Sequence, residues 1–342
     1  MIDHRKALDI LAASDARRAA RRRFIKVAGG STLALSGATL LSGCFDDENN
    51  DDIIPPTPVP SPTPTPTAAP VTDADILNLA LNLEYLEAQF YSFAVNGTGL
   101  ATAQTASGGG AAGGTVTGGA RVDFSGDPVV GAYAREIAAD EAAHVAFLRN
   151  ALGSAAVAMP NINISGDANG AFTAAARAAG VVGANETFNP YSSPENFLLG
   201  AFLFEDVGVS AYKGAAPLLS SKIYLEAAAG ILAAEAYHAG LVRTVLYAKG
   251  MSTAALVTAT TKISDARDQL DKNGDSDQGI AGANGASNVV LADGDGIAYS
   301  RNSQQVHNIV YLNATGANRT GGGFFPNGTN NGNASLRVGL PS

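Results

Sequence analysis

Four stretches of the chain carry apolar residues at the three- and four-residue spacing of a helix that buries one face. They predict helices over about 73–94, 128–152, 194–212 and 222–248. Capping residues mark two of the starts: Thr72 or Asp73 before the first helix and Ser193 before the third. Ser193 is followed by a proline suited to a first turn, and the second helix begins near Asp127-Pro128. The pattern therefore predicts an all-α fold in which the helices form two hairpins.

Polar residues interrupt this apolar pattern at matching places in the two hairpins. A glutamate followed seven residues later by a tyrosine occurs in the first and third helices, and Glu-x-x-His occurs in the second and fourth. The residues concerned are Glu84 with Tyr91, Glu205 with Tyr212, Glu141 with His144, and Glu235 with His238. Because residues three apart lie on the same face of a helix, each Glu and His pair can contact one ion.

The surroundings of these carboxylates point to a metal. Glu205 follows an eight-residue stretch made only of apolar residues and one glycine, and Glu235 lies among Ala, Ile and Leu. An unpaired carboxylate buried in such a core costs several kcal/mol. Two divalent cations would cancel four such charges and leave both imidazoles neutral. The pattern therefore predicts a dinuclear metal site whose ligands are Glu84, Glu141, His144, Glu205, Glu235 and His238.

The segment from about 73 to 249 resembles the ferritin-like superfamily. Within it, Leu-Asn-Leu-Glu-Tyr-Leu-Glu-Ala at 81–88 is similar to the ferritin-like domain family that includes desiccation-related proteins. The resemblance implies an antiparallel four-helix bundle with the same six ligands. It also implies that Glu141 and Glu235 bridge the two ions, while His144 and His238 each bind one ion.

Four further residues are predicted to support the site. Asp140 resembles the aspartate of di-iron enzymes that orients a ligand histidine, and the alternative is a solvated surface residue. Glu87 is interpreted as an extra ligand or a proton relay, or else as a surface-facing residue. Tyr91 and Tyr212 are catalytic candidates that bond bridging carboxylates or pass electrons; otherwise they are core aromatics whose hydroxyls have found a partner.

The first 44 residues predict export. Arg21-Arg22 and the weakly apolar stretch from Val27 to Leu41 resemble a twin-arginine signal, and Leu-Ser-Gly before Cys44 resembles a lipoprotein cleavage site. The resemblance implies acylation of Cys44 and attachment to a membrane in the cell envelope or periplasm. Acyl chains contribute about 0.8 kcal/mol per buried CH₂ group, so several of them hold a protein on a bilayer.

The remaining segments carry no strong catalytic signal. Residues 45–72 include a proline- and threonine-rich stretch typical of an extended spacer, and residues 73–250 form the expected bundle. Residues 251–342, rich in Gly and Asn, predict an irregular extension that packs on the bundle, with a short helix near 303–312. Acidic residues alternate between Asp271 and Asp277 as in a calcium loop, but no glutamate stands at the twelfth position, so a polar turn is favoured.

Composition excludes several classes of protein. The net charge of −9 argues against a nucleic-acid partner, which requires a basic face. A single cysteine rules out an intramolecular disulfide framework and any multi-cysteine metal site. No apolar run reaches the roughly 18 residues of a membrane-spanning helix.

The function hypothesis is a dinuclear redox protein, with iron as the preferred metal and manganese as the second. A di-iron centre would react with oxygen or peroxide in a ferroxidase- or peroxidase-like way, and it would need an external electron donor. A di-manganese catalase is the first alternative, in which hydrogen peroxide is both oxidant and reductant. The second is a non-enzymatic envelope stress protein with a structural metal site. The sequence leaves the oligomeric state open.

Overall fold

The computed structural model describes residues 70–341. Its longer helices are α2 (Asp73–Asn96), α4 (Pro128–Leu152), α6 (Pro194–Ala215), α7 (Lys222–Gly250) and α8 (Ala254–Asp271). The shorter elements are α3 (Thr102–Thr105), β1 (Val116–Gly118), β2 (Ile162–Ile164), α5 (Ala171–Ala178) and α9 (Ser303–Val310). Within this part of the chain, no helix has both the length and the apolar content needed to cross a bilayer. The predicted all-α class is confirmed, and the strands within residues 70–341 are limited to two of three residues each.

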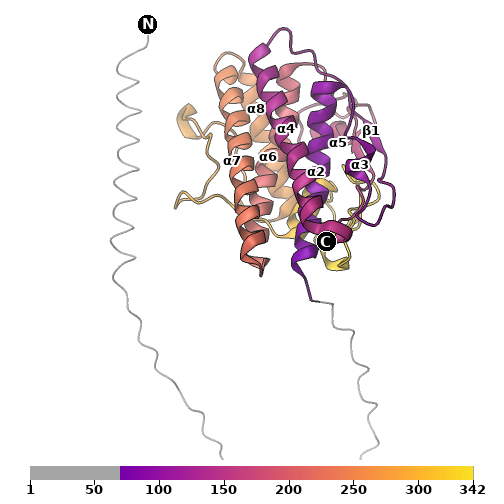
Figure 1. Cartoon of the computed structure of the whole chain (residues 1–342). Coiled ribbons are helices and arrows are strands. Elements are labelled where there is room, and N and C mark those ends of the chain that lie inside the picture. Colours follow the sequence, from indigo (N-terminus) through magenta and orange to yellow (C-terminus); the bar gives the residue numbers. More distant parts are fainter. Residues whose placement is uncertain (1–69, 342) are drawn as a thin grey trace, which may run out of the picture. The chain divides into compact units, whose positions relative to one another are not determined.

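Two hairpins form the bundle. Helix α2 packs along α4, and α6 packs along α7, while α2 also contacts α6 (Figure 1). The predicted caps Thr72 and Ser193 are in place, and Asp127 caps α4. Each of these side chains accepts a hydrogen bond from a backbone N–H in the first turn of its helix. All four predicted helices are present, with ends within three residues of the predicted ones.

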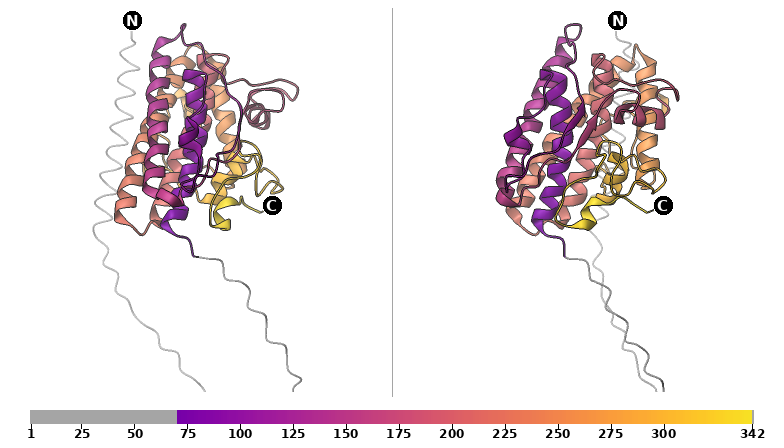
Figure 2. Two further views of the ribbon diagram at one scale, coloured as in Figure 1. Left: turned by 45° about the vertical axis from the view of Figure 1, so that its right-hand side comes forward. Right: turned by 90° about the vertical axis from the view of Figure 1, so that its right-hand side faces the viewer.

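Helix α2 is enclosed on every side. Every residue from 76 to 92 is buried, because the loop after α2 and the C-terminal segment cover the face that turns away from the other helices (Figure 2). Asn82 exchanges hydrogen bonds with the backbone of Asn330, at 2.7 and 2.9 Å. Asn78 does the same with the carbonyl of Ala155 and the N–H of Val157, both at 3.0 Å. Polar residues on the outer face of α2 thus hold the segments that cover it.

The connections between the helices contain short regular elements. The Gly-rich loop after α2 holds α3 and β1, and β1 pairs in parallel with β2 from the segment after α4, Val116 opposite Ile162. This loop packs beside the C-terminal half of α2, where the N–H of Val122 bonds the carbonyl of Ala94.

The C-terminal extension is more regular than expected. Its first part is the 18-residue helix α8, which packs against α6 and α7, so the expectation of an irregular segment from 251 onward is wrong there. The sequence of α8 hides this because its large buried apolar residues, Leu256, Ile263 and Leu270, recur only every seven positions. The predicted short helix is α9, which packs on α6 and α8. The predicted export segment, with Arg21, Arg22 and Cys44, lies outside the described residues.

Candidate metal centre

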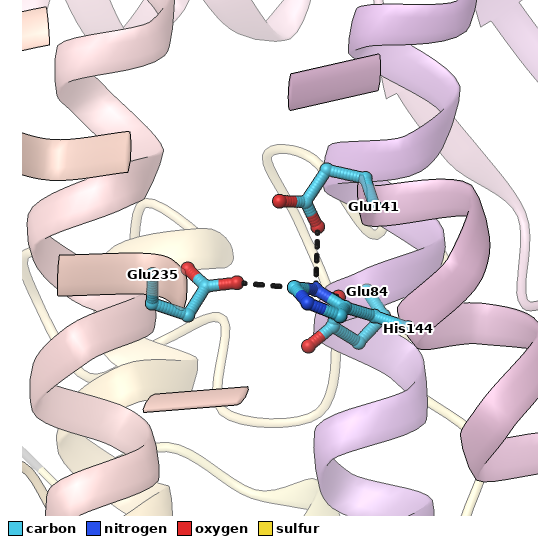
Figure 3. A group of neighbouring side chains, drawn as sticks. All are labelled: Glu84, Glu141, His144 and Glu235. Atoms are coloured by element: carbon cyan, nitrogen blue, oxygen red, sulfur yellow. Dashed lines mark hydrogen bonds and ion pairs between the residues drawn. The ribbon is translucent and has the colours of Figure 1, made fainter. Parts of the chain in front are cut away.

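The four long helices bring six predicted side chains to one point in the core. Glu84 comes from α2, Glu141 and His144 from α4, Glu205 from α6, and Glu235 and His238 from α7. Figure 3 shows His144 between the carboxylates of Glu141 and Glu235. All four glutamates are at most 1% exposed, and the two imidazole ring centres lie 6.2 Å apart.

The donor atoms form two groups that share one residue. Glu84, Glu141, His144 and Glu235 offer atoms that all lie within 4.8 Å of one another; we call this the His144 position. Glu141, Glu205 and His238 do the same and form the His238 position. Glu141 therefore lies where it can bridge two ions, as the family resemblance implies. Glu235, the other implied bridge, belongs to the His144 position alone.

Six donor atoms of this centre lack hydrogen-bond partners. Within residues 70–341, seven buried side-chain N and O atoms have no hydrogen bond, and six of them belong to Glu141, Glu205, Glu235 and His238. His238 Nδ1 lies 3.0 Å from Glu141 Oε1, yet the two atoms are not in hydrogen-bonding geometry. Buried polar atoms are normally satisfied, and carboxylate and imidazole donors suit iron, manganese or zinc. These residues therefore fit a pair of metal ions.

The electrostatics of the centre are those of uncompensated acids. Burial, reinforced by the neighbouring carboxylates, raises the pKa of Glu141 and Glu235 well above the ordinary value. Burial also raises the pKa of Glu205, to about 8. Glu84 differs: burial raises its pKa, but the 3.2 Å contact with His144 and the attraction between their charges lower it below the ordinary value. Without cations, the centre therefore holds protons.

Each tyrosine bonds a glutamate of the opposite hairpin. The Tyr91 hydroxyl on α2 donates to Glu205 Oε1 on α6, and the Tyr212 hydroxyl on α6 donates to Glu84 Oε1 on α2. The partners are thus Glu205 and Glu84, not the expected bridging residues Glu141 and Glu235. Both tyrosines are buried, and burial raises the pKa of each hydroxyl well above its ordinary value, so both stay protonated donors.

Asp140 contacts a histidine of the other hairpin. Its Oδ2 lies 3.1 Å from His238 Nε2, which leaves Nδ1 facing Glu141 and Glu205. A hydrogen bond to one ring nitrogen fixes the tautomer whose other nitrogen can bind a metal. At the equivalent place on α7 stands Ala234, which cannot offer the same bond to His144.

Glu87 faces inward, one turn after Glu84. It is 5% exposed, lies outside both donor groups and lines a small apolar cavity with Phe204 and Phe324. Burial raises its pKa well above the ordinary value, with repulsion from Glu205 and Glu84 adding to the effect. The interpretation of Glu87 as a surface-facing residue is therefore wrong.

A glycine missed by the sequence reasoning makes room beside Glu87. Gly208 stands on α6 three residues after Glu205, as Glu87 does after Glu84. A Cβ atom at Gly208 would lie 2.3 Å from Glu235 Oε2 and 3.3 Å from Glu87 Oε1. The only sequence signal was a small residue where the other hairpin has a glutamate.

A second buried charged group adjoins the centre, and it was not predicted from the sequence. We call it the arginine–aspartate cluster; its members are Asp206, Arg243, Arg267, Asp271, Asp277 and Arg301. Asp206 Oδ2 accepts from Arg243 and Arg267, each at 2.8 Å. Asp271 and Asp277, the ends of the calcium-like pattern, bind arginines instead. These pairs join α6, α7 and α8 to the segment that precedes α9.

Comparison with known proteins identifies a family for the helical bundle. Residues 72–248 match the family described as "Ferritin-like domain". "Ferritin-like catalase Nec2" from Nesocodon mauritianus is 29% identical over 272 residues, which are 75% of this chain and 83% of that protein. "Desiccation-related protein PCC13-62" from Craterostigma plantagineum is 28% identical over 248 residues, 69% of this chain and 76% of that protein. No solved structure matches significantly.

Proposed function

The chain belongs to the ferritin-like domain family, and from this premise we propose that it is a dinuclear-metal protein that disproportionates hydrogen peroxide. The observation that carries the proposal is the set of six unpartnered donor atoms on three buried glutamates and a histidine. The similarity to a protein named a ferritin-like catalase supports the choice of reaction.

The proposed reaction needs no electron donor. Two molecules of hydrogen peroxide give two of water and one of dioxygen, so one peroxide supplies the two electrons that the other accepts. Two bound redox-active ions supply the means to hold those electrons between the two halves of the reaction. This reaction suits a chain whose single cysteine cannot form a multi-cysteine electron-transfer site.

The chain's own residues orient the donors and hold protons. The hydroxyls of Tyr91 and Tyr212 fix the carboxylates of Glu205 and Glu84, and Asp140 fixes the ring of His238. Glu87, which belongs to neither donor group, keeps a proton beside the centre because burial raises its pKa. Reduction of one peroxide takes up two protons, and oxidation of the next releases two. In this proposal the Glu87 carboxyl gives one of these protons to the departing peroxide oxygen and recovers one from the next peroxide, while the second proton is exchanged with water.

The test is oxygen evolution by metal-loaded protein. The full chain is loaded with Fe²⁺ or Mn²⁺, its metal is counted, and dioxygen release from hydrogen peroxide is followed with an oxygen electrode. We expect two ions per chain and one dioxygen per two peroxides. Glu141→Gln should lose both, while Glu136→Gln, a change on an exposed face of the same helix, should keep both. Two bound ions without oxygen evolution would contradict the proposed reaction.

Iron oxidation chemistry is the nearest competitor. With two ferrous ions, the same residues support a ferroxidase- or peroxidase-like reaction, the first hypothesis from the sequence. That reaction consumes dioxygen or peroxide without releasing dioxygen, and it turns over only with an added reductant. The gas measurement therefore separates the two reactions, and metal analysis identifies the ion.

A non-enzymatic role is the second candidate, favoured by the similarity to a desiccation-related protein. In that role, the metal ions bind the four helices together and do no chemistry. Bound ions that neither change redox state nor react with peroxide, but raise the unfolding temperature, would support it.

We further propose that the protein is exported and lipid-anchored. The support is the order of Arg21-Arg22, an apolar stretch and a small-residue site before Cys44. In a bacterial host with a twin-arginine pathway, the protein should fractionate with membranes. Cys44→Ser should abolish acylation and leave the protein bound to the membrane only through an uncleaved signal. Equal incorporation of labelled fatty acid into both proteins would overturn the assignment of Cys44.

A further inference from the structure

We propose that the two metal positions are unequal, and that the His238 position exchanges its ion through a groove between α4 and α7 while the His144 position retains its ion. The inference deepens the proposed function and rests on it, because it requires a dinuclear centre. Three independent features of the structure support it: the donor sets, the groove, and the different environments of the two histidines.

The donor sets differ in number and charge. The His144 position has three carboxylates and an imidazole, whereas the His238 position has two carboxylates and an imidazole. Because each carboxylate adds a negative charge, a divalent ion is attracted more strongly to the His144 position. The His238 position keeps more of its coordination sphere open to water or to a small ligand, as catalytic metal sites do.

The groove reaches His238 and not His144. It has a volume of about 600 Å³ and runs between α4 and α7, with Val289 and Val290 of the extension on its wall. His238 and Asp140 line it, together with the acidic residue Glu136, but His144 does not. By exposed fraction alone, the His144 side chain is the more accessible, at 12% against 6% for His238. The assignment of the route to the His238 position therefore rests on the groove, which His238 lines and His144 does not.

Asp140 connects the groove to a ligand of the His238 position. About half of the Asp140 side-chain surface is exposed. Its Oδ2 contacts the Nε2 of His238, which is 5% exposed and whose Nδ1 has no hydrogen bond. A cation that arrives along the groove therefore meets a solvated carboxylate already joined to the ligand of the His238 position. Ala234, the counterpart of Asp140, offers nothing comparable to His144.

Stepwise loading tests the inequality. Metal-free full-length protein is titrated with Mn²⁺, and the loaded protein is then mixed with an excess of chelator while metal release is followed. We expect two binding steps, and a fast and a slow release phase, each of one ion per chain. Release of both ions in one phase with a single rate would overturn the inference.

Variants assign the fast phase. Removing a partner of a ligand histidine lowers metal affinity by about 10- to 100-fold, so Asp140→Asn should weaken the second binding step by that factor and leave the first unchanged. Glu136→Gln, one turn away in the same groove, should change neither step by more than about twofold, because it removes only a solvated charge. Equal weakening of both steps by Asp140→Asn would contradict the assignment.

Narrowing the groove tests the route. Ala234→Leu should slow the fast release phase at least about tenfold while leaving the affinities unchanged, and Ala233→Leu, on an exposed position outside the groove, should change neither. An unchanged fast phase in Ala234→Leu would place the route elsewhere. Failure to bind any metal would defeat the proposed function itself, whereas two ions with equal rates would defeat only this inference.

Discussion

The core contains two groups of buried charge that meet at neighbouring residues, Glu205 and Asp206. The metal centre gathers four glutamates and two histidines, with no arginine or lysine among them. The arginine–aspartate cluster gathers three acids and three bases, paired at distances between 2.5 and 2.9 Å. Only Arg267 Nε lacks a partner there, whereas the metal centre has six such atoms.

The comparison teaches how to distinguish a structural charge group from a binding one. The acids of both groups are at most 3% exposed, so burial does not separate them. Internal compensation does: arginines of the chain pair with Asp206, Asp271 and Asp277, whereas, of the basic residues that the structure describes, only the two histidines lie against Glu141 and Glu235. The acids of the arginine–aspartate cluster bind arginines within the fold, whereas the acids of the metal centre remain available to ions from solution. Variants of the two groups test this contrast between compensated and uncompensated buried acids.

The largest effect should come from breaking the compensated group. Asp206→Ala leaves the facing guanidinium groups of Arg243 and Arg267 short of a buried partner, which costs about 3–5 kcal/mol. Urea unfolding of the metal-free protein measures this loss. Asp265→Ala, an exposed change on α8, should alter the free energy of unfolding by less than about 0.5 kcal/mol. Similar values for the two variants would contradict the role given to Asp206.

Removing an acid from the metal centre should instead raise the free energy of unfolding of the metal-free protein. Glu141→Gln deletes a buried carboxyl whose pKa burial and the neighbouring carboxylates raise, so the metal-free protein should gain stability at pH 7. The same variant should no longer be stabilised by added Mn²⁺. Unfolding curves with and without metal measure both effects. A loss of stability in the metal-free variant would show that the wild-type carboxylate is compensated after all.

The two groups should also differ in their response to pH. Between pH 4.5 and about 8, folded Glu205 keeps a proton that the unfolded chain has released, so the metal-free protein should lose stability as pH rises through this range. Glu141 and Glu235, whose pKa values are also raised, act in the same direction, whereas the lowered pKa of Glu84 affects stability only below this range. Each retained proton contributes about 1.4 kcal/mol per pH unit to the slope.

Thermal unfolding across this pH range, with and without metal, checks the slope. Bound cations require deprotonated ligands, so the stabilisation by metal should grow with pH. Glu205→Gln provides the control, since the metal-free variant should show a shallower slope than the wild type. A metal-free wild-type protein that becomes more stable toward pH 8 would contradict the expectation.

The smallest expected effect is the difference in stability between two glycine-to-alanine variants. An alanine in place of a helical glycine ordinarily stabilises by about 1 kcal/mol, and Gly230→Ala should do so because nothing lies within 4 Å of the added carbon. Gly208→Ala should gain less, because its methyl group pushes Glu235 aside, and it should weaken metal binding. Unfolding and metal titration of both variants provide the comparison. Equal metal affinities would show that Glu235 has room to move.

The helices and the six donors were predictable because both depend on local spacing. Apolar periodicity and capping residues placed α2, α4, α6 and α7, and two Glu-x-x-His motifs lie on one face of their helices whatever surrounds them. The cross-bundle bond from Asp140 was anticipated only through a family resemblance. The structure shows its geometry because it shows α4 beside α7.

The arginine–aspartate cluster was not predictable because its members are distant in the sequence. Asp206 meets Arg243 and Arg267, 37 and 61 residues away, and no spacing rule connects them. The same holds for Gly208, whose importance depends on where Glu235 of another helix points. Local patterns determine which residues share a helix face, whereas the packing of helices determines which faces meet.

The reciprocal bonds of Tyr91 and Tyr212 make each half of the bundle incomplete by itself. A chain cut at the exposed turn near Gly183 would yield two fragments, each with a glutamate whose hydroxyl donor resides on the other. Glu141 lies on one fragment and Glu205 on the other, so neither fragment alone completes the His238 position. Co-expressed fragments should therefore reassemble through complementation, and mixing in a Tyr91→Phe fragment should weaken that reassembly.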